Sequence, residues 1–219
     1  MNEPQDPRHQ TKAAATSEAA TDRTDCDEEV PEAGAETVTT LPLPGFAASS
    51  IVVAVDAGGW ISSLGRDRLV FLTGRALAAA ARHLGLPAAL ATEISVTYAD
   101  DATVREANHA WRGKDKPTNI LSFPLVQLRP GKLPGPLAGD LVLAFETVAR
   151  EAASEEKPFA DHLSHLIVHG FLHLLGYDHL DDGEAAEMEA AEIAILGSLG
   201  IADPYGEPPD RSAAGRADS

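Results

Sequence analysis

Five of the eight histidines lie close together in the chain, between residues 162 and 179. His169 and His173 are four positions apart in an apolar segment, so on a helix they project from one face, one turn apart. Two imidazoles at that spacing can share one metal ion. Gly176 stands where the apolar run stops, and a glycine there can adopt the left-handed conformation that ends a helix. We expect the chain to turn back at this point and bring His179 round as a third ligand.

Three neutral imidazoles leave one position of a tetrahedral zinc ion open, which is typical of catalytic rather than structural zinc sites. We therefore predict one Zn²⁺, or another transition metal ion, per chain, held by His169, His173 and His179. His162 and His165 come one or two turns earlier, and each helical turn rises about 5.4 Å, so they are poor additional ligands. We expect His165 to lie in the core or to support a ligand, and His162 to lie at the surface.

The spacing of the three histidines is that of the long metzincin protease motif. In those proteases a glutamate directly follows the first histidine and acts as general base. Here Gly170 stands at that position, so no carboxylate can act from it. Asp178 precedes the last histidine, and it could cap a turn, orient an imidazole or transfer a proton.

A second stretch with chemical potential runs from Trp111 to Pro124 and holds three basic residues and one acidic residue. The planar guanidinium of Arg112 suits a phosphate group. On composition alone, however, a solvated turn with a surface arginine is the simpler interpretation.

Together these stretches resemble the YbeY family of bacterial endoribonucleases and rRNA maturation factors. The family signature His-Gly-x-Leu-His-Leu-Leu-Gly-Tyr-Asp-His is matched at 169–179, and a second motif, Arg-Gly-Lys-Asp-x-Pro-Thr-Asn-x-Leu-Ser-Phe-Pro, at 112–124. Gly139-Asp140-Leu141 and the apolar residues after them resemble a third motif of the family. The resemblance covers residues 51–200. It implies that the three signature histidines bind one metal ion, and it makes Arg112 and His169 the candidate catalytic residues.

The elements that must position these residues follow from the hydrophobic pattern. Strands are predicted at 51–55, 93–98, 118–123 and 140–144. Helices are predicted at 66–84, 101–111, 145–156, 159–175 and 183–199. In the last helix we place Glu192 among the polar residues, off the apolar stripe. The fold class is α/β (α+β): a single small domain with a mixed sheet of about four strands, packed helices and a three-histidine metal site at a helix end.

The two ends of the chain have a different composition. Residues 1–48 hold ten acidic and three basic residues without apolar periodicity, which predicts a disordered acidic tail. The predicted domain spans 49–203, and 204–219 is predicted to be a second disordered tail. The single cysteine, Cys26, excludes an internal disulfide framework. No segment reaches the roughly 18–20 apolar residues of a membrane span, and no targeting signal is evident, so we expect a cytoplasmic protein.

The formal net charge of −17 argues against non-specific nucleic-acid binding, so RNA would have to be attracted locally. Six basic residues could line one groove: Arg105, Arg112, Lys114, Lys116, Arg129 and Lys132. The resemblance implies a single-strand-specific, metal-dependent endoribonuclease of small-subunit rRNA 3′-end maturation and ribosome quality control. It also implies ribosomal proteins and an Era-type GTPase as partners, and neither DNA nor a membrane.

Two other functions stay open at this point. The first is a metal-dependent hydrolase of another substrate, such as a peptide, although Gly170 counts against it. The second is a non-catalytic ribosome assembly factor, in which zinc stabilises the fold and the basic loop binds rRNA. The residues also do not separate attack by water from attack by the RNA 2′-hydroxyl.

Overall fold

The structure, a computed structural model, describes residues 38–206. Five strands lie in this part of the chain: β1 (Thr39–Leu43), β2 (Phe46–Val55), β3 (Glu93–Ala99), β4 (Ile120–Pro124) and β5 (Leu137–Ala144). Six helices accompany them: α1 (Gly58–Leu64), α2 (Arg66–His83), α3 (Asp101–Arg112), α4 (Phe145–Ser154), α5 (Phe159–Leu174) and α6 (Asp182–Ser198). None of these helices combines the length and the apolar character that crossing a membrane requires.

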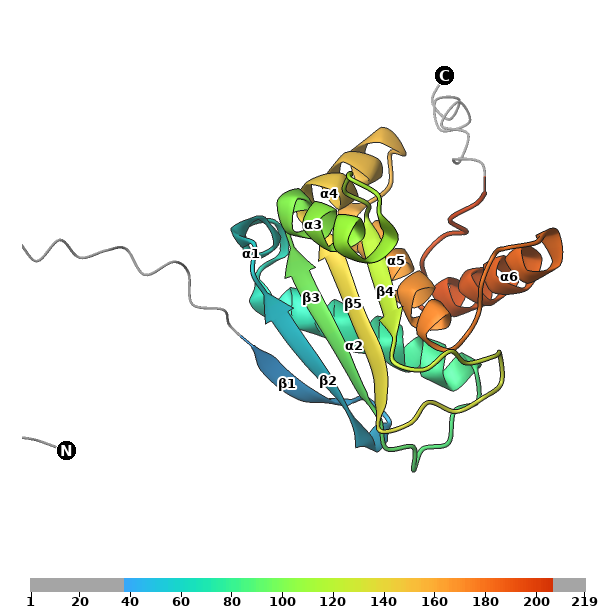
Figure 1. The fold of residues 1–219 in the computed structure, drawn as a ribbon. Helices are drawn as coiled ribbons and strands as arrows, with labels where there is room; N and C mark the ends of the chain where they lie inside the picture. Colours follow the sequence, from blue (N-terminus) through green and yellow to red (C-terminus); the bar gives the residue numbers. More distant parts are fainter. Residues whose placement is uncertain (1–37, 207–219) are drawn as a thin grey trace, which may run out of the picture. The chain divides into compact units, whose positions relative to one another are not determined.

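The five strands form one mixed sheet in the order β1-β2-β3-β5-β4 (Figure 1). The three central strands β2, β3 and β5 run parallel. Helices α1 and α2 return the chain from β2 to β3, whereas α3 and the antiparallel strand β4 lie between β3 and β5 in the chain. The two outer strands are antiparallel to their neighbours, and β4 forms one edge. Pro124 ends β4 at this edge, where a missing backbone N–H is tolerated.

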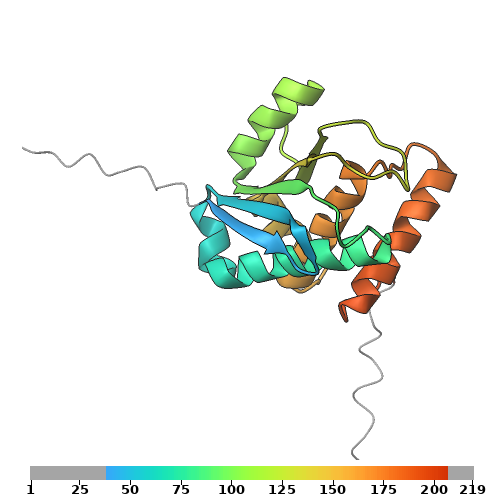
Figure 2. The ribbon, with the colours of Figure 1, turned by 90° about the horizontal axis from the view of Figure 1, so that it is seen from below.

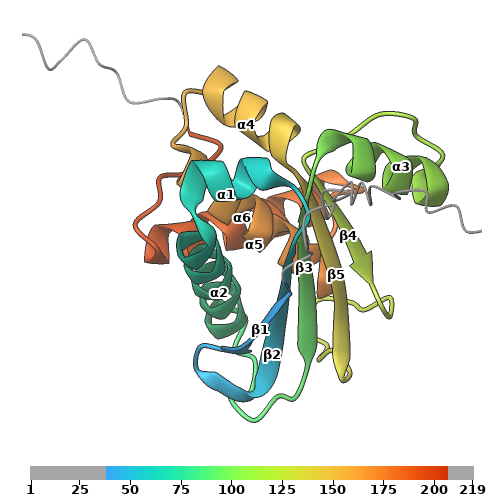
Figure 3. The same cartoon turned by 90° about the vertical axis from the view of Figure 1, so that its left-hand side faces the viewer.

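Helices cover the two faces of the sheet unequally. Helices α2, α5 and α6 lie on one face together with α1, whereas α3 lies on the opposite face (Figures 2 and 3). Alternate residues of the central strands point into the larger layer, so side chains such as Ile51, Val53, Ile94 and Val96 are fully buried. The most apolar helix, α5, packs against α2 and against the β4–β5 edge, which places its carboxyl end beside the edge strand.

The predicted α+β domain is confirmed, with one strand more than the four expected. The extra strand, β1, lies within the segment 1–48 that we predict to be disordered, so that prediction is wrong for residues 38–48. Leu43 and Phe46 are 2% and 3% exposed, because the hairpin of β1 and β2 packs them into the core. The short helix α1 is also absent from the prediction.

The predicted C-terminal tail needs a similar correction at its start. The Lys157 ammonium donates a hydrogen bond to the Pro204 carbonyl at 2.8 Å, and the Tyr205 hydroxyl bonds to Glu192, so the chain is part of the fold up to these residues. The other predicted tail residues, 1–37 with Cys26 and 207–219, lie outside the described residues.

Candidate metal centre and groove

Helix α5 carries two histidines that are partly exposed and a glycine that faces the sheet. His169 and His173 are partly exposed, whereas Gly170 is buried between them. A Cβ atom at Gly170 would lie only 2.6 Å from Ile120 Cδ1 and 2.8 Å from Leu141 Cδ2, so the helix rests closely on β4 and β5. In metzincin proteases this position carries the glutamate that acts as general base. Here it faces the sheet and has no room for a carboxylate.

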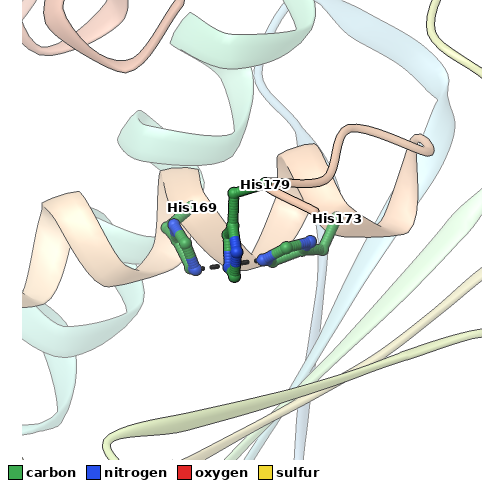
Figure 4. A group of neighbouring side chains, drawn as sticks. All are labelled: His169, His173 and His179. Atoms are coloured by element: carbon green, nitrogen blue, oxygen red, sulfur yellow. Dashed lines mark hydrogen bonds between the residues drawn. The ribbon is translucent and has the colours of Figure 1, made fainter. Parts of the chain in front are cut away.

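The turn after α5 brings the third histidine back to the first two. Gly176 has a φ of 88°, and the Tyr177 N–H bonds to the Leu172 carbonyl at 3.1 Å, which closes the end of the helix. Figure 4 shows the three imidazoles pointing toward one another, two from α5 and His179 from the segment that follows. One ring nitrogen from each lies within 4.8 Å of the others. The structure thus brings together all three predicted ligands.

The hydrogen bonds of His169 and His173 decide which ring nitrogens face the centre. His169 Nδ1 lies 2.8 Å from Glu192 Oε1, and His173 Nδ1 lies 2.9 Å from the Tyr177 carbonyl oxygen. A carboxylate and a carbonyl can only accept, so both Nδ1 atoms carry a hydrogen, and each ring in its neutral form presents the lone pair of Nε2. The two Nε2 atoms are 3.1 Å apart.

That separation suits a shared metal ion. Two imidazole nitrogens, each about 2.05 Å from a tetrahedral zinc ion, would be about 3.3 Å apart. Burial, together with the neighbouring His169, lowers the pKa of His173 to about 4, so this ring is a neutral ligand at pH 7. The donor set, its tautomers and its spacing therefore all fit one transition metal ion.

A fully buried carboxylate supports this centre, and the sequence reasoning missed it. Glu192 is 0% exposed, although we expected it among the polar residues of α6. It stands four positions after Met188 and three before Ile195, both of which are buried, so helical periodicity places it on the core-facing stripe. The sequence signal that identifies Glu192 is therefore an acidic residue at a core-facing position of a helix.

Hydrogen bonds keep the buried Glu192 ionised. Burial raises the pKa of this carboxyl, but the hydrogen bonds from His165, His169 and Tyr205 outweigh burial and lower the pKa to about 2. His165 therefore supports a ligand through Glu192, which is one of the two roles expected for it. His162 is buried and its Nε2 lies 3.2 Å from Glu151 Oε2, so the surface position expected for it is wrong.

A groove runs past the metal centre along the β4 edge. It is lined by residues from β4, from the loop after it, from the turn after α5 and from the end of α3: Arg112, Ser122, Pro124, Gln127, Leu128, His173, Gly176, Tyr177, Asp178 and His179. Asp178 accepts the His179 backbone N–H at 2.9 Å, so it caps this turn. The groove thus joins the candidate phosphate-binding arginine to two of the three metal-ligating histidines.

Several contacts hold the loop that follows Arg112, the last residue of α3. The Asn108 side chain donates to the Lys116 carbonyl at 2.7 Å, and Arg105 makes two hydrogen bonds to Asp115, at 2.6 and 2.9 Å. The Asn119 amide donates to Glu151 at 2.9 Å. These bonds hold the loop that follows Arg112 at both ends.

The expected collection of six basic residues in one groove is wrong. Of the six, Arg112 alone is among the residues that line this groove. Arg105 is engaged with Asp115, and Lys132 lines a separate hollow beside His83. The loop after β4 meets the turn at Gly176 with its backbone at Leu128 and Arg129.

Comparisons with known proteins agree on one family. The family model described as Endoribonuclease YbeY matches residues 63–200. The Endoribonuclease YbeY of Rhizobium meliloti (strain 1021) is 50% identical over 168 residues, which cover 74% of this chain and 98% of the relative. The Endoribonuclease YbeY of Sinorhizobium medicae (strain WSM419) is 48% identical over 167 residues, with the same two shares.

The solution structure of TM1509 from Thermotoga maritima matches with a TM-score of 0.41 and 21% identity, over 64% of this chain and 91% of that one. The family match is far more specific, because it contains the groove, the three histidines and the arginine in one continuous stretch. The chain belongs to the YbeY family.

Proposed function

We propose that this chain is a metal-dependent endoribonuclease that cleaves single-stranded RNA, with Zn²⁺ as its metal. One observation carries the proposal: Arg112 lines the same groove as His173 and His179, although it comes from a helix on the opposite face of the sheet. A phosphodiester in this groove can therefore contact a guanidinium and a metal centre together. The relatives, which are named endoribonucleases, support this reading of the groove.

Each side chain has a definite part in the proposed reaction. His169, His173 and His179 hold the metal ion, which when bound acts as a Lewis acid toward a phosphoryl oxygen. Arg112 binds the phosphate through its planar fork and stabilises the negative charge that develops as the bond breaks. Asp178 keeps His179 in place through the turn that it caps.

We further propose that a partner delivers the RNA. The chain carries a formal net charge of −17, so long-range repulsion opposes the binding of free RNA. The family resemblance supports rRNA of the small ribosomal subunit as the substrate, with 3′-end maturation and ribosome quality control as the process. It also supports ribosomal proteins and an Era-type GTPase as partners in the cytoplasm.

A cleavage assay with metal analysis tests the proposal. Precursor small-subunit rRNA and a panel of peptides are incubated with the wild-type protein and with His173→Ala, and bound metal is measured in both proteins. We expect RNA cleavage and bound metal in the wild type alone, and no peptide hydrolysis. Peptide hydrolysis with intact RNA, or RNA cleavage by a metal-free variant at the wild-type rate, would overturn the proposal.

A further inference from the structure

One buried carboxylate connects the metal centre to the C-terminal end of the described chain. Glu192 Oε1 accepts from His169 Nδ1 at 2.8 Å. Glu192 Oε2 accepts from His165 Nε2 at 3.0 Å and also from the Tyr205 hydroxyl. An ionised carboxylate is costly to bury unless its oxygens are hydrogen-bonded, and these three donors meet that condition.

Several contacts hold the segment that carries Tyr205 against the helices. Lys157, just after α4, donates to the Pro204 carbonyl at 2.8 Å, and the Tyr205 backbone N–H bonds to Asp203 Oδ1 at 2.9 Å. The Tyr205 ring meets the His165 ring edge-on, with centroids 5.8 Å apart. The hydroxyl of Tyr205 is therefore presented to Glu192 by an anchored backbone.

The state of His169 depends on this carboxylate. With Glu192 accepting from Nδ1, the Nε2 lone pair of His169 faces His173 and the metal centre. Without that acceptor, the ring can rotate, or its hydrogen can move to Nε2 and occupy the position of the metal. A carboxylate that binds the far nitrogen of a metal-ligating histidine also raises the basicity of the ligand.

We propose that Glu192 is the positioning residue of the metal centre, and that Tyr205 in turn holds Glu192. The inference rests on the proposed metal site and adds two residues that do not touch the metal. It makes the short segment after α6 part of the apparatus that sets metal affinity.

The chain offers a matched control on a neighbouring helix. Glu151 of α4 accepts from His162 Nε2 at 3.2 Å and from the Asn119 amide at 2.9 Å. It lines the same hollow as His165, His169 and Tyr205. Glu151→Gln thus removes the same charge near the same place, but from a histidine that is not one of the three ligands.

Zinc affinity, measured by competition with a chelator, tests the proposal. We expect Glu192→Gln to weaken zinc binding about ten- to hundredfold and Tyr205→Phe to weaken it by a smaller factor, with Glu151→Gln unchanged. Unchanged affinity in Glu192→Gln, or an equal loss in Glu151→Gln, would overturn the role of Glu192. Unchanged affinity in Tyr205→Phe, which keeps the ring and loses only the hydroxyl, would overturn the role of Tyr205.

A second measurement needs no metal. Nitrogen-15 NMR of the imidazoles in the metal-free protein reports which ring nitrogen carries the hydrogen. We expect His169 to be the Nδ1–H tautomer in the wild type and a mixture in Glu192→Gln, because the amide offers one oxygen in place of two. A pure Nδ1–H tautomer in both proteins would contradict the inference. A wild type that shows this tautomer and binds no zinc would contradict the metal site alone.

Discussion

His169 Nε2 and His173 Nε2 face each other at 3.1 Å. Each ring uses its Nδ1 hydrogen on the other side, His169 toward Glu192 and His173 toward the Tyr177 carbonyl. A hydrogen on one of these two Nε2 nitrogens bridges this distance in the metal-free protein, and a metal ion can take its place. The two nitrogens thus lie at a separation that one metal ion can share.

The first prediction concerns metal content. The purified protein should carry about one zinc or similar ion per chain, and His169→Ala, His173→Ala and His179→Ala should each lose most of it, because two imidazoles hold an ion far less well than three. His109→Ala, at an exposed position of α3, is the control and should keep its metal. Elemental analysis that finds full occupancy in all three ligand variants would refute the site.

The second prediction separates catalysis from binding. Arg112→Ala should keep the metal and the fold but lose RNA cleavage by about 10²–10³-fold, because one charged donor to the transition state is gone. Arg112→Lys should recover only part of the rate, since an ammonium lacks the bidentate fork. Single-turnover rates measure both effects, and a wild-type rate in Arg112→Ala would make this arginine an ordinary surface residue.

Lys114 provides the comparison for Arg112, because it is not among the residues that line the groove. Lys114→Ala should weaken RNA binding modestly and make it less sensitive to salt, since fewer counterions are released on binding. Its cleavage rate at saturating RNA should stay near that of the wild type. A rate loss as large as that of Arg112→Ala would show that the local charge matters and the groove position does not.

The third prediction concerns the turn that delivers His179. Gly176→Ala places a side chain at a φ of 88° and a Cβ 2.5 Å from the Leu128 carbonyl group, so the backbone must shift. Gly85→Ala has a similar φ of 64° but open space around the new Cβ. We expect about 1–2 kcal/mol of lost stability for Gly85→Ala and a larger loss for Gly176→Ala.

Denaturant unfolding of the metal-free proteins measures this difference, and zinc affinity should fall in Gly176→Ala alone. Equal stability losses in the two variants would show that the loop after β4 does not constrain the turn.

The fourth prediction tests the corrected start of the domain. Phe46 is 3% exposed, so Phe46→Ala should lower the free energy of unfolding by about 3–5 kcal/mol. Val38 is 56% exposed, and Val38→Ala should change the free energy of unfolding by no more than about 0.5 kcal/mol. Similar unfolding curves for wild type and Phe46→Ala would mean that the β1–β2 hairpin is not part of the core.

The predictable part of the site is local. The spacing of His169 and His173 places both on one face of a helix. The glycine after them predicts where that helix ends and that the chain then turns back. The hydrophobic pattern likewise places α2, α3 and α5 to within a residue or two of their observed ends. Each of these features depends on contacts between near neighbours in the chain.

The parts that were missed depend on contacts between distant residues. Strand β1 is short, and its burial comes from pairing with β2 rather than from its own pattern. Glu192 is tolerated in the core because His165 and His169, from another helix, donate to it. Whether Lys132 and Arg129 reach the groove depends on the path of a long loop, which periodicity does not determine.

Reconstitution tests the central claim most directly. Metal is removed from the wild-type protein, zinc is returned in steps, and bound zinc and the rate of single-stranded RNA cleavage are measured in the same samples. We predict a rate that rises in proportion to bound zinc, reaches its limit at about one ion per chain and stays near zero in His173→Ala. Full cleavage by the metal-free wild-type protein would contradict the account.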